Sequence, residues 1–161
     1  IIPDRYREEY FHYVGTKADS LGLAPMDLKE KSAALTLLPQ VAELVAGGKL
    51  KLSDSVAELL ALKGADKSLT VASILADYTS KANADYLKSL LNKYRNHAST
   101  DEVATNMFAA IGMNSTSISG TEVHTTGYDY NKFLFTLQNK GKYAGKQVIS
   151  AKAAELVLNN L

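Results

Sequence analysis

The chain has 161 residues, of which 46% are hydrophobic and 22% charged, and this composition suits one globular domain with a modest core of its own. Eighteen basic and 17 acidic side chains leave a formal net charge of +1, so the charge favours neither a nucleic acid nor an anionic membrane as a partner. The absence of cysteine excludes disulfides, thiolate metal ligands and cysteine nucleophiles.

Metal and membrane binding find no support in the sequence pattern. The three histidines, His12, His97 and His124, are far apart and have no metal-ligand spacing between them. We therefore expect no metal and no cofactor. No apolar run approaches the roughly 20 residues that a transmembrane helix needs, so we expect no membrane span in this segment.

The first 24 residues are expected to form an N-terminal helix or extended segment followed by a loop, within a single compact domain overall. Residues 4–14 combine charges that suit a helix with an aromatic, strand-prone run, so a helix start giving way to a short extended piece is predicted. Residues 15–25 contain two glycines and a proline and predict a loop. Residues 25–161 are expected to form a single compact helical domain.

A long apolar helix is predicted from Asp27, which stands three residues before Glu30 as in a capping box. Leucines and valines then recur at helical spacing as far as Val45. Pro39 should kink or split this helix, and the pair Gly47–Gly48 should end it.

Further helices are predicted over residues 53–64 with Ser53 as N-cap, 68–80, and 83–94. Ser99 and Glu102 form another capping box, which opens a helix that ends at Gly112. Residues 114–127 predict a polar loop. Two last helices follow. One covers residues 128–141 with Thr126 as its N-cap, and the other begins after its N-cap Ser150. The predicted fold is mainly α, a compact irregular bundle of about seven helices with at most a short strand near the N-terminus.

The order of these pieces resembles the helical domain of the serine β-lactamase and penicillin-binding-protein superfamily. Residues 25–56 resemble the nucleophile helix and the turn after it, and residues 69–91 resemble the helix, Ser-Asp-Asn loop and helix that follow. Residues 106–119 and 124–161 resemble the Leu-Gly-Met segment and the two helices that close the domain. In this family a sheet flanks the helical domain and supplies a Lys-Thr-Gly motif, so the resemblance implies the helical half only.

The family's Ser-x-x-Lys motif, which places a serine nucleophile and its lysine on one helix face, is not recovered here. Aligned on Pro25-Met26, the serine position falls on Leu28 and the lysine position on Lys31. Aligned on the Gly-Lys-Leu turn at 48–50, the pair falls on Lys31 and Ala34 instead. Ser32 lies nearby, but Leu35 stands three residues after it. Lys31 is thus a candidate remnant of the site or an ordinary solvated lysine.

The second motif, Ser-Asp-Asn, is only partly present. Ser80 keeps the serine, Lys81 and Ala82 replace the Asp and Asn, and Asn83 comes one position late. The resemblance implies proton transfer for Ser80 and substrate orientation for Asn83. Alternatively, both residues simply cap the following helix.

Glu122 and His124 stand two residues apart in the predicted polar loop. They could act as a general acid and base, or they could be solvated loop residues. The aromatic run Tyr128, Tyr130, Phe133 and Phe135 could border a ligand groove or could be packing.

Three functions remain open from the sequence, one of which is an ordinary α-helical interaction domain whose resemblance to the family is accidental. Loss of the nucleophile predicts a non-catalytic binding or scaffold module, with a peptidoglycan peptide or a β-lactam-like molecule as ligand. The alternative is a fragment of an active serine hydrolase, of β-lactamase or D,D-peptidase type, that uses another serine such as Ser32 or Ser80. For either of these last two functions the resemblance implies an extracytoplasmic location, in the cell wall or secreted.

Overall fold

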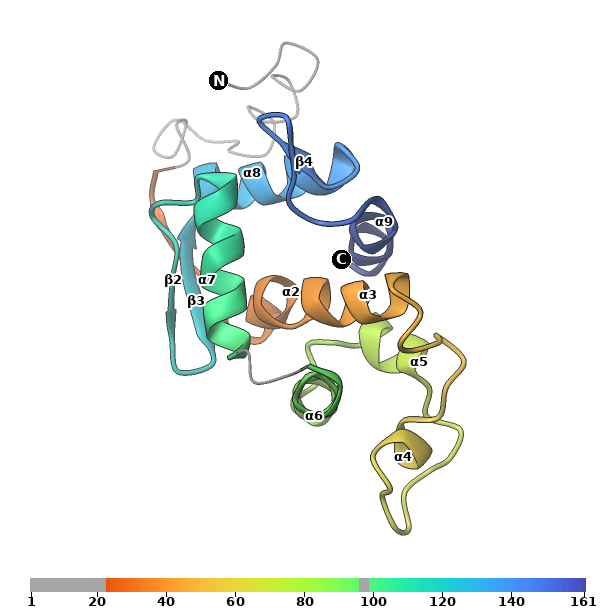
Figure 1. Cartoon of the computed structure of the whole chain (residues 1–161). Coiled ribbons are helices and arrows are strands. Elements are labelled where there is room, and N and C mark those ends of the chain that lie inside the picture. Colours follow the sequence, from red (N-terminus) through yellow and green to blue (C-terminus); the bar gives the residue numbers. More distant parts are fainter. Residues whose placement is uncertain (1–22, 96–98) are drawn as a thin grey trace.

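A broken apolar rod forms the centre of the molecule. The computed structural model describes residues 23–95 and 99–161, so the helix expected within residues 4–14 lies outside the described part of the chain. After strand β1 (Pro25–Asp27), the rod consists of the 3-10 helix η1 (Lys29–Ser32), α2 (Ala33–Thr36) and α3 (Leu38–Ala46). Figure 1 shows α2 and α3 running in line through the middle of the other helices.

The break in the rod confirms the effect predicted for Pro39. The chain leaves α2 at Leu37, and Pro39 then stands in the first turn of α3, where a missing N–H costs no helical hydrogen bond. Leu35, Leu38 and Val41 on this rod are at most 1% exposed. The rod therefore supplies much of the hydrophobic core.

The remaining helices surround the rod. Their bounds are α4 (Val56–Leu59), α5 (Val71–Ala76), α6 (Lys81–Tyr94), α7 (Thr100–Ile111), α8 (Gly127–Gln138) and α9 (Ala151–Asn160). Helices α6 and α9 pack on α3, α5 packs on α6, α7 packs on α2, and α8 packs on α9. The expectation of a mainly α fold is confirmed at this level.

Side-chain caps begin most of these helices, as the sequence predicts for three of them. The hydroxyls of Ser99, Thr126 and Ser150 accept hydrogen bonds from the N–H groups at the third helical position. Gly112 ends α7 in the left-handed conformation, with φ of 72°. The cap predicted at Ser53 is wrong, because Ser55 caps a shorter helix.

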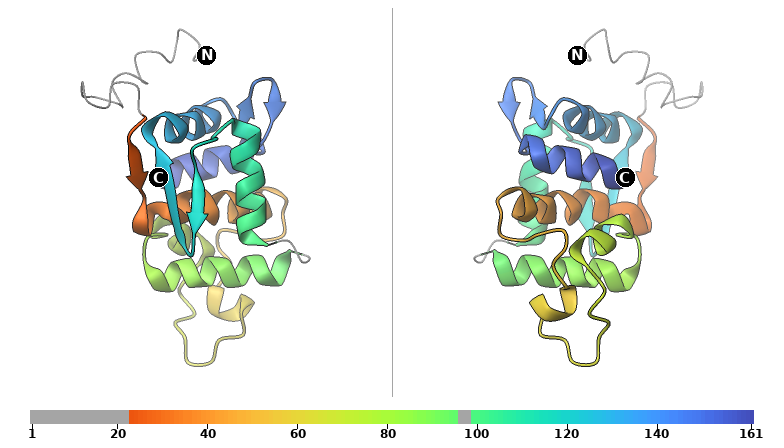
Figure 2. Two further views of the ribbon diagram at one scale, coloured as in Figure 1. Left: turned by 90° about the vertical axis from the view of Figure 1, so that its left-hand side faces the viewer. Right: turned by 90° about the vertical axis from the view of Figure 1, so that its right-hand side faces the viewer.

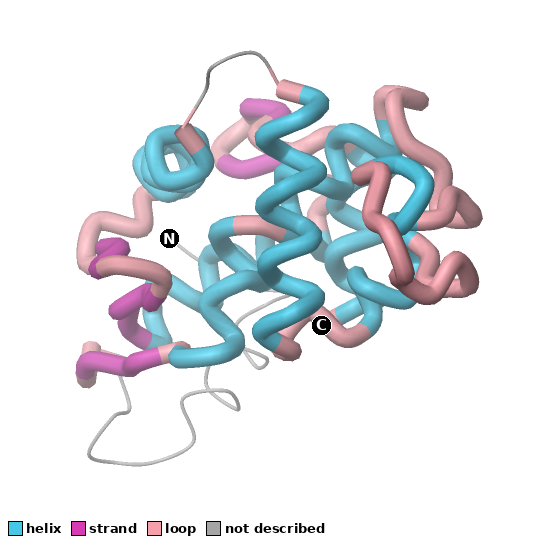
Figure 3. The backbone as a smooth tube through the Cα atoms, turned by 90° about the horizontal axis from the view of Figure 1, so that it is seen from below, coloured by secondary structure: helices cyan, strands magenta, loops and turns pink. Residues whose placement is uncertain are grey.

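The largest correction is a three-stranded antiparallel sheet. It has the order β1–β3–β2, with β2 at Ser117–Ser119 and β3 at Glu122–Thr126, where a polar loop was predicted. Figure 2 shows this sheet beside α7, and Figure 3 shows its strands gathered at one side of the helices. A two-stranded hairpin, β4 (Lys142–Tyr143) and β5 (Lys146–Gln147), joins α8 to α9.

The sheet also corrects the predicted start of the long helix. Asp27 does not form a capping box, since its backbone pairs with His124 of β3 and its carboxylate bonds to the His124 imidazole. The chain turns into η1 only after Leu28, and no side chain caps that turn. Strand pairing between residues almost a hundred positions apart has overridden the local helix signal.

Candidate functional site

The candidate site is a pocket of about 310 Å³ at the front end of the rod. Its walls come from η1 and α2, the start of α6, the start of α7 and the turn between β2 and β3. Two of these parts, η1 with α2 and the start of α6, lie in the segments that the resemblance equates with the nucleophile helix and the Ser-Asp-Asn loop. A pocket of this size can hold a small ligand or the end of a peptide.

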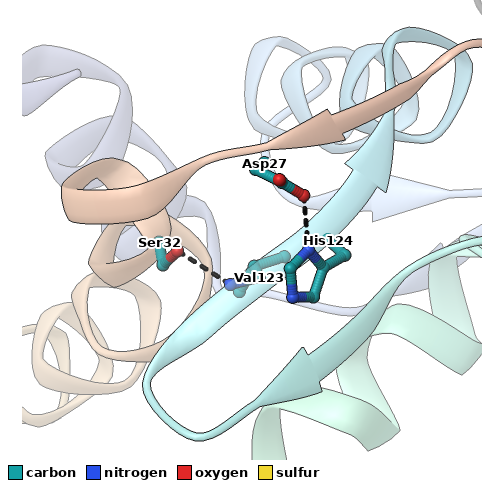
Figure 4. A network of polar contacts seen from close by, with 4 residues as sticks. All are labelled: Asp27, Ser32, Val123 and His124. Atoms are coloured by element: carbon teal, nitrogen blue, oxygen red, sulfur yellow. Dashed lines mark hydrogen bonds and ion pairs between the residues drawn. The ribbon is translucent and has the colours of Figure 1, made fainter.

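The serine nearest the expected nucleophile position has a structural role. Ser32 lines the pocket but is only 1% exposed, and its hydroxyl oxygen accepts a hydrogen bond of 2.8 Å from the backbone N–H of Val123. Figure 4 shows this bond joining the rod to strand β3. The Ser32 carbonyl accepts a further bond of 3.2 Å from the Thr36 hydroxyl. Ser32 thus holds the sheet against the rod.

The two residues at the predicted Ser-x-x-Lys positions lie apart from the pocket. Leu28 packs its side chain against the core, and its N–H donates to the carbonyl of Val123. Lys31 is exposed, and the pocket wall is built from its neighbours Lys29, Glu30 and Ser32. The candidate residue Lys31 is therefore not brought to the pocket.

Ser80 and Asn83 lie together, and both are occupied in capping. Ser80 is the N-cap of α6, and its hydroxyl accepts from the N–H of Asn83 at 3.4 Å. The Asn83 amide donates to the carbonyl of Asp77 at 3.0 Å and to its carboxylate at 3.4 Å. Their neighbours Thr79 and Lys81 line the pocket in their place.

The predicted pairing of Glu122 with His124 has a different geometry. Both residues lie on β3 rather than on a loop, and the Nδ1 atom of His124 bonds to the carboxylate of Asp27 on the neighbouring strand (Figure 4). Across the turn, Glu122 stands opposite Ser119 in the register of β2 and β3. His124 is thus committed to the contact between β1 and β3.

The aromatic run after Thr126 contributes to packing. Phe133 is completely buried and its ring lies 6.1 Å from that of Tyr130, while the ring of Phe135 meets Tyr143 edge-on at 6.5 Å. Tyr128 lies under the ammonium group of Lys132, which is 4.4 Å from the ring centre. None of these aromatic residues lines the pocket.

The charged residues of the pocket were not predicted as site residues. Three basic and three acidic side chains contribute to its wall, namely Lys29, Lys81, Lys88, Glu30, Asp85 and Asp101. Lys81, Asp85 and Lys88 follow one another at helical spacings of four and three, which places them on one face of α6. That spacing is the signal in the sequence from which this wall could have been found.

Replacing Ser32 with alanine is expected to destabilise the fold by about 1–3 kcal/mol, because the buried N–H of Val123 loses its acceptor. Chemical denaturation of the variant and the parent measures this difference. Ser89→Ala serves as the control, since Ser89 is an exposed residue in the middle of α6. Equal stability of Ser32→Ala and the parent would remove the structural role assigned to this hydroxyl.

Comparisons with known proteins add no relative. No protein-family model, no curated protein and no solved structure matches the chain. Within the described residues, no helix has the length and apolar character needed to cross a bilayer, and no group of three acidic, histidine or cysteine side chains could hold a metal ion.

Proposed function

We propose that the chain is a non-catalytic binding module, related to the helical domain of the penicillin-recognising serine hydrolases, that holds a charged peptide in the pocket at the front of the rod. The observation that carries the proposal is the pocket itself. It is bounded in part by the segments that the resemblance equates with the nucleophile helix and the Ser-Asp-Asn loop, yet its polar groups differ from those of a Ser-x-x-Lys site.

The arrangement at the start of the rod supports a binding role over an acyl-transfer role. Nucleophilic catalysis requires a hydroxyl within hydrogen-bond reach of a base. Ser32 presents a buried hydroxyl bonded to a backbone N–H, and Leu35 rather than a lysine follows one turn later on α2. Ser80 uses its hydroxyl to cap α6.

The charges of the pocket favour a peptide as the ligand. Lysine ammonium groups can bind a carboxylate, and aspartate or glutamate carboxylates can bind an ammonium group. A short peptide carrying both groups matches a wall with three residues of each sign. If the chain is related to the penicillin-recognising serine hydrolases, the ligand is a peptidoglycan stem peptide or a β-lactam that mimics the end of this peptide. Binding then takes place outside the cytoplasm, at the cell wall.

A second candidate function is that of a serine acyl hydrolase. One observation favours it, since Ser32 belongs to the wall of the pocket and Lys29 and Lys81 line the same space. Acyl transfer would also need an oxyanion hole. In the family, the flanking sheet supplies the oxyanion hole.

The binding proposal is tested by titrating the chain with a stem peptide that ends in D-Ala-D-Ala, using calorimetry and backbone NMR. We expect saturable binding, with shifted signals at the start of α6 and in the turn between β2 and β3. Lys81→Glu should weaken binding about tenfold or more, since it turns an attraction for the peptide carboxylate into a repulsion.

The matched control is Lys152→Glu, which makes the same change of charge on an exposed residue of α9 outside the pocket. This variant should bind like the parent. Absence of saturable binding at millimolar peptide, or an equal loss in both variants, would refute the proposal.

A further inference from the structure

A second and larger cleft lies along the rod, away from the proposed peptide pocket. It has a volume of about 630 Å³ and is bordered by α3, α7 and the segment from β5 to Ile149. Its walls are mostly aliphatic, with Pro39, Val103, Met107 and Val148 among them. This volume lies in the range of cavities that bind small organic molecules. None of the residues that line it belongs to the peptide pocket.

One end of the cleft carries a fixed guanidinium group. Arg95 donates to the side-chain oxygen of Gln40 on α3 and, at 3.3 Å, to the hydroxyl of Thr100 at the start of α7. Gln40 is itself held by bonds of 2.6 and 2.9 Å to the carbonyls of Thr36 and Thr100. Both helices thus position the Arg95 side chain.

The charge along the cleft is predominantly positive. Lys49 and Lys146 join Arg95 among its lining residues, against one acid, Glu43. The carboxylate of Glu43 is engaged by the hydroxyl and the N–H of Ser150. Arg95 is half-buried, and this burial lowers the pKa of its guanidinium from the ordinary value. A partly desolvated cation beside an apolar wall is a suitable partner for an anionic head group.

We propose that this cleft binds a carboxylate amphiphile, with its alkyl chain between α3 and α7 and its carboxylate against Arg95. The aliphatic wall accounts for the alkyl chain, and the guanidinium held by Gln40 and Thr100 accounts for the anionic head. A guanidinium matches the planar geometry of a carboxylate, and the two groups form charge-assisted hydrogen bonds. The inference does not depend on the proposed peptide ligand.

Decanoate, below its micellar concentration, is the probe. We expect saturable binding by calorimetry, with shifts in the methyl signals of Val103, Met107 and Val148. Hexanoate should bind at least tenfold more weakly because it buries a shorter chain, and decylammonium at least tenfold more weakly because its charge is repelled. Equal binding of decanoate and decylammonium would show non-specific apolar adsorption and overturn the proposal.

Two variants on α7 locate the ligand. Ala110 lines the cleft from an exposed position, so Ala110→Phe should obstruct the alkyl chain and weaken decanoate binding at least tenfold. Ala109 is the exposed neighbour outside the cleft, and Ala109→Phe should bind like the parent. Arg95→Gln should remove the preference for decanoate over decylammonium. No binding by the parent at millimolar decanoate, or equal binding by the two phenylalanine variants, would contradict the assignment.

Discussion

Gly141→Ala is expected to destabilise the protein by about 2–5 kcal/mol, the sum of two costs. A Cβ at this position would overlap the carbonyl oxygen of Ile149 and lie 2.7 Å from its carbonyl carbon, and such overpacking costs about 1–3 kcal/mol. The φ of 82° adds about 1–2 kcal/mol for any residue with a Cβ. The free energy of unfolding from urea denaturation measures the loss.

The reason for the close approach is the packing of the β4–β5 hairpin. The carbonyl of Gly141 accepts from the N–H groups of Val148 and Ile149, and its own N–H donates to the carbonyl of Thr136. Gly145 in the same hairpin has a similar φ of 80° but open space around it. Gly145→Ala should therefore cost only about 1 kcal/mol. Similar losses of unfolding free energy for the two variants would contradict the close approach of Gly141 to the carbonyl of Ile149.

Leu38→Ala is expected to destabilise the protein by about 2–5 kcal/mol. Leu38 lies on the central rod and is 1% exposed, so truncation removes buried methyl groups and leaves a cavity among several helices. This is a large fraction of the 5–15 kcal/mol that stabilises a typical domain. Thermal and urea unfolding should both show the loss.

The matched control for this variant is Leu158→Ala on α9. Leu158 is 36% exposed, so the same deletion should cost about 1 kcal/mol or less. If Leu38→Ala were as stable as Leu158→Ala, the rod of α2 and α3 would not be the centre of the core.

The helices could be predicted from the sequence because their signals are local. At Ser99, Thr126 and Ser150, the capping hydroxyl lies only three residues before the N–H group that donates to it. These caps can therefore be predicted without information from elsewhere in the chain. The same holds for the division of the long helix beside Pro39. Spacing and caps are together sufficient for the mainly α character.

The sheet could not be predicted in the same way because its pairing is non-local. Val123 and Thr125 point into the core while Glu122 and His124 point outward, a period of two that covers only one short, mostly polar strand. The partner of this strand in β1 is three residues long and almost a hundred positions away. The hydrogen bonds between β1 and β3 can be predicted only when the rod and β3 are known to lie side by side.

The candidate site shows the same division between local and non-local information. The capping alternative weighed for Ser80 and Asn83 is a local geometry, and the structure contains the corresponding bonds. The bond from Val123 to Ser32 joins residues 91 positions apart, and no spacing rule predicts it. The charged wall of the pocket likewise forms from three separate parts of the chain.

The intact mass of the protein after prolonged incubation with a labelled penicillin and with a fluorophosphonate decides whether either serine of the candidate site is reactive. We expect an unchanged mass with both reagents, because the hydroxyl of Ser32 is buried against β3 and that of Ser80 caps α6. A stable adduct of either reagent mapped to Ser32 or Ser80 would contradict the non-catalytic assignment.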